Sequence, residues 1–208
     1  MKELLTGGKQ CLYTVFHPFN GFDQVKWEKK GSPKFCLLIL LAFFLTSVFD
    51  QVLTGFIFNT YNPDKISVPS IFLITMGGFL IVFVANWAVS SLMFTEGELH
   101  NIFIVLCYSL TVLIIGDAVV TFASNFVATE EVMILTSIQM VCYVYFAFLV
   151  VAGLTTIHEY GFGGSIMSII MSVVAAAIIL FIGILVFTML ERMISFFSSV
   201  FEELMRRM

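Results

Sequence analysis

Residues 101–124 read NIFIVLCYSLTVLIIGDAVVTFAS, and Asp117 is the single acidic or basic residue among them. About 20 consecutive apolar residues in a helix are enough to cross the hydrocarbon core of a bilayer. This run therefore predicts a membrane-spanning helix. Four further runs of comparable length and composition cover residues 35–58, 68–94, 131–157 and 166–190. The sequence predicts an all-α fold, a polytopic bundle of about five transmembrane helices.

Composition also indicates a membrane protein. Hydrophobic residues make up 60% of the chain and charged residues 12%, whereas a soluble domain has about 45–50% and 25%. With a net charge of −4 and no basic stripe, no nucleic-acid partner is expected. The cysteines are scattered without a CxxC pair, which predicts free apolar thiols rather than a zinc ribbon or a disulfide framework. They are Cys11, Cys36, Cys107 and Cys142.

Three segments follow from the positions of the runs. Residues 1–34 are predicted to form a cytoplasmic and interfacial segment, residues 35–190 a five-helix transmembrane domain, and residues 191–208 an amphipathic C-terminal tail. Ser32 suits the N-cap of the first span and Pro33 its first helical position. Short connections predict that consecutive spans pack as antiparallel neighbours. The tail is expected to form a helix on the membrane surface, and a simple extension of the last span is the alternative.

The distribution of basic residues predicts the orientation. An odd number of spans places the two termini on opposite sides of the membrane. The segment before the first span contains six lysines, Lys2, Lys9, Lys26, Lys29, Lys30 and Lys34. The other side has four basic residues, Lys65, Arg192, Arg206 and Arg207. Because basic residues are in excess on the cytoplasmic side, the N-terminus is predicted in the cytoplasm and the C-terminus on the opposite side.

Two acidic residues inside apolar runs need a specific explanation. Asp at the centre of a spanning helix costs about 2.5–3.5 kcal/mol. Asp50 precedes the end of its span by about eight residues and Asp117 by about seven, and Gln139 lies about eight residues into the next span. All three are therefore predicted to lie in one layer, roughly 10–12 Å below the outer surface. The layer is either a proton or cation site, or a structural hydrogen-bond clamp or water-filled dimple.

The histidines gather on the opposite side of the predicted bundle. Together with three glutamates they supply the ligand types that zinc and related divalent transition metals prefer. The group comprises His17, Glu96, Glu98, His100, His158 and Glu159. Metal binding and ordinary loop solvation with helix capping are both consistent with it. Neither a nucleophile elbow nor an HExxH sequence is present, so no catalytic residue is assigned.

Small residues predict close helix packing in two runs. The residues concerned are Gly77 and Gly78 in the second run, and Gly164, Ser168, Ser172 and Ala176 in the fifth. Small side chains let the backbones of membrane helices approach closely. The sequence leaves open whether these contacts form within one bundle or between protomers, and the oligomeric state is not predicted.

Three motifs resemble the Yip domain (Ypt-interacting protein) family in its bacterial form. The first is His17-Pro-Phe-Asn-Gly-Phe22, followed by residues 26–32, which read KWEKKGS. The second consists of Glu96-Gly-Glu98, Ile102-Phe103 and Tyr108, and the third is Thr156-Ile-His-Glu-Tyr-Gly161. With the five-span layout, the resemblance covers nearly the whole chain. It implies a five-helix membrane domain with a cytoplasmic N-terminus.

The resemblance also implies a class of function. Eukaryotic relatives act in vesicle traffic and contact prenylated Rab-type GTPases. This chain has only 34 residues before its first predicted span, so a GTPase partner is not expected. Bacterial relatives look like accessory proteins, often encoded beside sugar-transport genes.

We therefore expect an integral membrane scaffold or accessory protein, in transport or trafficking, that presents its cytoplasmic face to a membrane or peripheral protein. The expected partners are the lipid bilayer and a membrane protein. One alternative is a small ion or solute conduit that uses Asp50 and Asp117. The other is a metal-binding membrane enzyme or sensor at the cytoplasmic face, for which a divalent transition metal is the cofactor considered.

Overall fold

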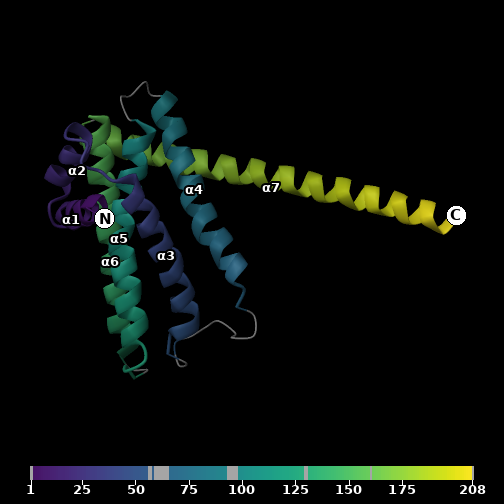
Figure 1. The fold of residues 1–208 in the computed structure, drawn as a ribbon, viewed down its shortest axis with the longest axis horizontal. Helices are drawn as coiled ribbons and strands as arrows, with labels where there is room; N and C mark the ends of the chain where they lie inside the picture. The colour runs from purple at the N-terminus through teal and green to yellow at the C-terminus, as the bar shows by residue number, and fades with distance from the viewer. Residues whose placement is uncertain are drawn as a thin grey trace.

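The computed structural model describes residues 2–55, 58, 66–92, 98–128, 131–159 and 161–207, which contain seven α-helices and no strand (Figure 1). The helices are α1 (Lys2–Phe16), α2 (Pro18–Trp27), α3 (Pro33–Leu53), α4 (Val68–Leu92), α5 (Leu99–Ala123), α6 (Val132–His158) and α7 (Phe162–Arg207). The five helices α3 to α7 are long and apolar enough to cross a membrane. The predicted all-α fold with about five spans is confirmed.

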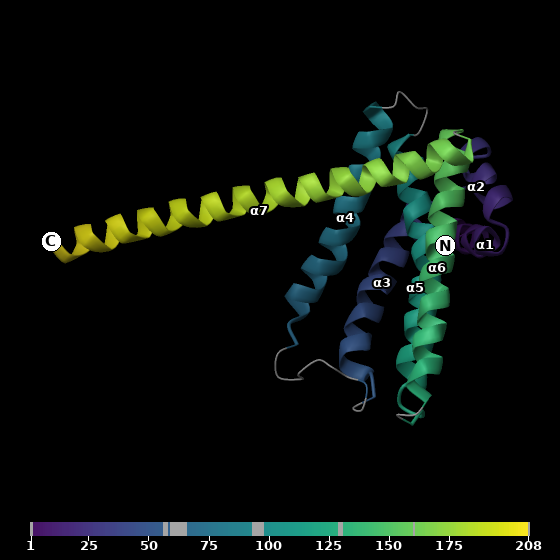
Figure 2. The same cartoon turned by 180° about the vertical axis from the view of Figure 1, so that it is seen from behind.

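Helices α3 to α6 run alternately up and down (Figures 1 and 2). We call the end at which α3 and α5 begin the Pro33 end, and the end at which they finish the Leu53 end. At the Pro33 end, α3 starts as predicted, because Ser32 is its N-cap and the Ser32 hydroxyl accepts a hydrogen bond from the Phe35 amide. Pro33 occupies the first helical turn, where a missing N–H costs nothing.

Helix α5 is the central helix of the bundle. Thirteen of its 25 residues are buried, against seven of 27 in α6. Helices α3 and α6 make the most extensive contacts with it. Because lipid tails are as apolar as leucine, close packing rather than escape from water holds such helices together.

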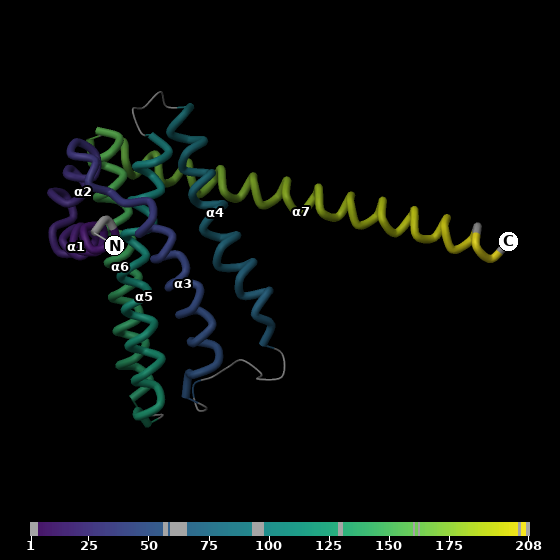
Figure 3. The backbone as a smooth tube through the Cα atoms, viewed as in Figure 1, coloured from purple at the N-terminus to yellow at the C-terminus, as the bar shows by residue number. Residues whose placement is uncertain are grey.

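Helix α7 lies across the other long helices instead of alongside them, and it extends far beyond the bundle (Figures 1 to 3). The predicted antiparallel packing of consecutive spans holds for α3 to α6 and is wrong for α7. Its buried face includes Ser165, Ser168 and Ser172, and Ser172 bonds to Asn86 of α4. Helix α7 contacts α4 more extensively than α6. Residues 191–207 continue α7 without a break. By contrast, a Cβ on Gly77 or Gly78 would meet no atom within 4 Å, so these two glycines make no close contact within the described part of the chain.

The N-terminal segment folds into two short helices that pack on α5 and α6. Pro18 starts a new helix because its ring and missing N–H are tolerated in a first turn but not inside a helix. Gly21 then allows α2 to cross α1 closely, since a Cβ there would lie 2.5 Å from Thr14 Cα. On α6, Gly153 leaves room for Phe22, because a Cβ would lie 3.0 Å from Phe22 Cε2.

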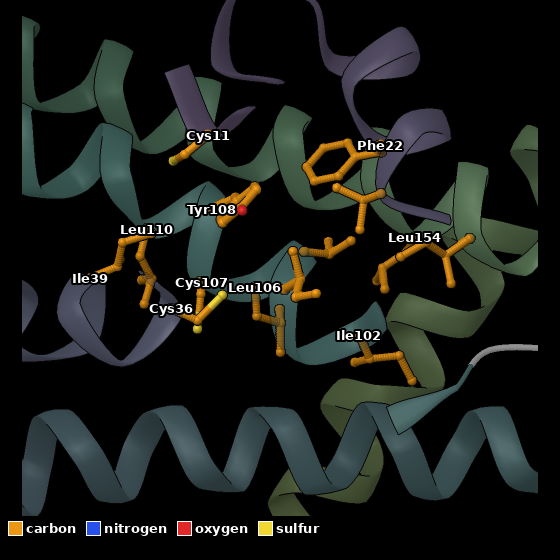
Figure 4. Close-up of a cluster of buried hydrophobic side chains, with 14 of the residues drawn as sticks. Cys11, Phe22, Cys36, Ile39, Ile102, Leu106, Cys107, Tyr108, Leu110 and Leu154 are labelled. Atoms are coloured by element: carbon orange, nitrogen blue, oxygen red, sulfur yellow. The ribbon is translucent and has the colours of Figure 1, made fainter. Parts of the chain in front are cut away.

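The core forms where α1, α2 and α3 meet α5 and α6, and it includes Phe22 and Tyr108, both fully buried (Figure 4). The N-terminal segment thus contributes side chains to the centre of the protein, in addition to any contact with the membrane surface. All four cysteines are free. Burial raises the pKa of the Cys11 thiol to about 11, which keeps this thiol protonated and unreactive at neutral pH.

Candidate functional site

A polar cavity of about 370 Å³ lies towards the Leu53 end, between α3, α4, α5 and α6. Asp50, Asp117 and Gln139 all line it. The cavity brings together the three residues that the depth calculation assigned to one layer. Its other polar lining residues are Ser47, Gln51, Thr75 and Tyr143, which sequence reasoning did not single out.

Both acidic side chains accept hydrogen bonds from neighbouring helices. The Thr121 hydroxyl of α5 donates to Asp50 Oδ1 at 2.9 Å, and so connects α5 to α3. The Gln139 amide of α6 donates to Asp117 Oδ1, and so connects α6 to α5. Each of these bonds joins two neighbouring helices. Chemically, two carboxylates on one cavity can also hold a cation or relay a proton, and none of the described residues that line this cavity is Lys or Arg.

The Leu53 end is fastened by further side chains of α5 and its C-terminal turn. The Ser124 hydroxyl accepts a hydrogen bond from the Gly55 amide at 2.8 Å, and the Asn125 amide donates to the Leu53 carbonyl at 2.9 Å. Sequence reasoning missed Thr121, Ser124 and Asn125 because each looks like an ordinary residue near a helix end. Their importance follows from the closeness of α3 to α5, which no local pattern reveals.

At the Pro33 end, the residues considered as metal ligands are dispersed. The His17 ring is exposed and stacks on Tyr13, with ring centroids 4.9 Å apart. Glu98 and His100 are exposed at the start of α5. Glu96 lies outside the described residues. Within the described part of the chain, no group of three or more His, Cys, Asp or Glu side chains could hold a metal ion.

His158 and Glu159 have separate partners. His158 is buried, and its Nε2 lies 3.2 Å from the Ser90 hydroxyl of α4. Glu159 adopts a left-handed conformation, with φ of 52°, immediately after α6. Its Oε1 lies 2.6 Å from Lys26 Nζ of α2. Their contacts hold helices together at this end, and the metal hypothesis stays a prediction.

A buried polar seam connects α4 to α7 beside His158. The Asn86 amide donates to the Ser172 hydroxyl at 3.1 Å, and the Ser90 hydroxyl donates to the Asn86 carbonyl at 2.8 Å. Asn86 was not predicted to have a role, although a single amide inside the second apolar run was a usable signal. This seam is the polar part of the contact through which α7 crosses α4.

A comparison with protein-family models matches residues 12–185 to the Yip1 domain. The chain belongs to the Yip1 domain family. The match begins within α1, includes all of α2 to α6 and ends within α7, which confirms the resemblance to the Yip domain family. Membership and the apolar helices together make this Yip1-domain protein a multi-pass membrane protein. No curated protein and no solved structure matches the chain.

The ion pair between α2 and α6 yields a stability prediction for this Yip1-domain protein. The Lys26 side chain is 8% exposed, whereas Lys30, which pairs with Glu28, is 45% exposed. Lys26→Ala should lower the free energy of unfolding by about 1–2 kcal/mol, because it removes packing of the lysine stem as well as the ion pair. Lys30→Ala should change it by no more than about 0.5 kcal/mol. Thermal unfolding in detergent measures both, and equal effects of the two substitutions would contradict the structural role of Lys26.

Proposed function

We propose that the chain is a non-enzymatic membrane scaffold or accessory protein of the Yip type, in transport or trafficking. It presents its Pro33 end to a membrane protein or a peripheral protein. The observation that carries this proposal is the outward face of α1 and α2. That face remains apolar and aromatic although the opposite face of the same two helices is already buried in the bundle.

The two faces are clearly separated. Phe22 and Val25 are buried against the bundle, whereas Phe16, Phe19 and Trp27 are 70%, 53% and 68% exposed. Of the three, Phe19 also meets Phe148 of α6 edge-on, with ring centroids 6.3 Å apart, and more than half of each side chain remains exposed. Aromatic side chains are enriched in protein interfaces, and a large exposed apolar patch indicates an interaction site. A non-enzymatic role is also supported by the polar side chains near this end. Lys26, Glu159 and His158 make contacts between helices.

The proposed sidedness rests on charge. The six lysines of residues 1–34 favour a cytoplasmic Pro33 end, because basic residues are retained on that side. A C-terminus on the opposite side then requires α7 to cross the membrane in line with α3 to α6. In the arrangement of Figure 1, α7 instead lies across them.

Site-specific photocrosslinking in native membranes tests the proposed interface. Phe19 on α2 and Phe72 on α4 are both 53% exposed, so a photoreactive phenylalanine at either position is equally accessible. We expect a discrete protein adduct from position 19, since it lies on the proposed interface, and none from position 72, which lies on the candidate span α4 outside that interface. Mass spectrometry identifies the adduct. The same adducts from both positions, or none from position 19, would refute the proposal.

A second candidate function is a small ion or solute conduit, and the cavity shared by Asp50 and Asp117 favours it. This candidate predicts proton or cation flux in proteoliposomes that falls at least about 10-fold in Asp50→Asn/Asp117→Asn, because both carboxylates are neutralised. Thr121→Val is the matched control, since it breaks the α3–α5 hydrogen bond and leaves both charges in place. Flux that the double substitution does not change removes the conduit.

A further inference from the structure

The polar cavity between α3, α4, α5 and α6 contains hydrogen-bond acceptors that the described residues leave open. Thr54 and Thr121 both donate to Oδ1 of Asp50, and Gln139 donates to Oδ1 of Asp117. None of the described residues donates to Oδ2 of either carboxylate. The Oε1 atom of Gln139 is buried and accepts no hydrogen bond from the described part of the chain. Three acceptors therefore remain for a ligand that can donate to them.

The charge of the cavity favours a cation as this ligand. The Ser47 and Thr75 hydroxyls do not supply the missing donors, because each donates to a carbonyl one turn back in its own helix. None of the described lining residues is Lys, Arg or His, so Asp50 and Asp117 share the cavity without a cationic partner among them. Acidic side chains inside a span pair with another group or mark the path of a substrate.

The size of the cavity favours an organic cation over a metal ion. At about 370 Å³, it has the volume of roughly twelve water molecules of about 30 Å³ each, and a bare metal ion would fill only a small part of it. Sites for small molecules begin at about 300 Å³. Within the described part of the chain, no group of three or more His, Cys, Asp or Glu side chains could hold a metal ion.

The open acceptors and the remaining walls define the chemistry of the ligand. A primary ammonium group has three N–H donors and a positive charge, which matches three acceptors of which two are carboxylate oxygens. Hydrogen bonds between charged groups are about twice as strong as neutral ones. The cavity also has an apolar wall, formed by Ile71 and Ile74 of α4 and Val120 of α5, against which a short alkyl chain can pack.

We propose that this cavity binds a small molecule with a primary ammonium group on a short alkyl chain. The ammonium donates to Oδ2 of Asp50, Oδ2 of Asp117 and Oε1 of Gln139, and the alkyl chain contacts the apolar wall. The proposal rests on the second candidate function, because it names the class of solute that a conduit at this cavity would carry.

Isothermal titration calorimetry of the full chain in detergent tests the proposal with three probes of similar shape. n-Butylamine carries the charge and the N–H donors, butyltrimethylammonium carries only the charge, and 1-butanol is neutral. Phosphate buffer is required, since Tris is itself a primary amine. The wild type should bind n-butylamine at least about 10-fold more tightly than either other probe, because an acceptor without a donor loses its hydrogen bond.

Two sets of variants locate the binding. Asp50→Asn/Asp117→Asn should weaken n-butylamine binding at least about 10-fold, since it removes both charges, while each Asn Oδ1 can still accept the bonds that join the helices. The control Glu191→Gln/Glu202→Gln removes as many acidic charges from α7, outside the cavity, and should leave binding within about threefold of wild type. Gln139→Met, which deletes the buried acceptor, decides the question if the double Asn variant does not fold.

Four results would overturn the proposal. They are a wild type that does not bind n-butylamine, equal binding of the three probes, equal losses in the two double variants, and Na⁺ or Ca²⁺ that binds to the cavity as tightly as n-butylamine. Flux in proteoliposomes separates the proposal from the conduit on which it rests. Binding of n-butylamine without any flux supports the site and removes the conduit, whereas proton flux without binding removes the site and supports the conduit.

Discussion

Tyr108 lies in the middle of the buried part of α5, and none of its side chain is exposed. Its hydroxyl accepts a hydrogen bond from the Ser32 amide at 3.3 Å, and its ring packs edge-on against Phe35. The start of α3 is thereby fixed to α5 at one point by a polar and an aromatic contact. Phe22 of α2 packs into the same cluster (Figure 4). The direction of α3 and the docking of α2 both depend on this contact, because residues 28–32 connect the two helices.

Away from this cluster, single polar side chains also join pairs of helices inside the apolar bundle. Three hydrogen-bonded pairs each join two helices, namely Asp50 with Thr121, Asp117 with Gln139, and Asn86 with Ser172. In hydrocarbon, such a bond contributes on average about 0.6 kcal/mol, with a maximum near 1.7, because the separated helices also find partners. Several of them can fix which helices are neighbours, although none of them dominates stability. Because each such hydrogen bond contributes little to stability, the cavity at Asp50 is compatible with both a structural clamp and a conduit.

The spans could be predicted because a helix that crosses a bilayer needs a minimum number of consecutive apolar residues. Residues 101–124 meet this requirement by themselves, whichever helices they pack against. The N-cap at Ser32 could be predicted for a similar reason, since capping depends on adjacent residues. What could not be predicted depends on contacts distant in sequence. His158 has the chemistry of a metal ligand, but 68 positions separate it from its partner Ser90. The crossing of α7 over α4 was also hidden, because small residues permit a close approach without fixing the angle between helices.

The N-terminal segment docks on the bundle, with α2 fixed to the end of α6 and its aromatic face turned outward. Zero-length carbodiimide crosslinking of the membrane-embedded chain tests it, because the reagent joins a lysine to a carboxylate only when the two groups are in contact. Lys26 Nζ and Glu159 Oε1, 2.6 Å apart, should form an amide that peptide mass spectrometry detects, and Lys30 with Glu28 is the local positive control. A Lys30–Glu28 crosslink without any Lys26–Glu159 crosslink would contradict the docking of α2.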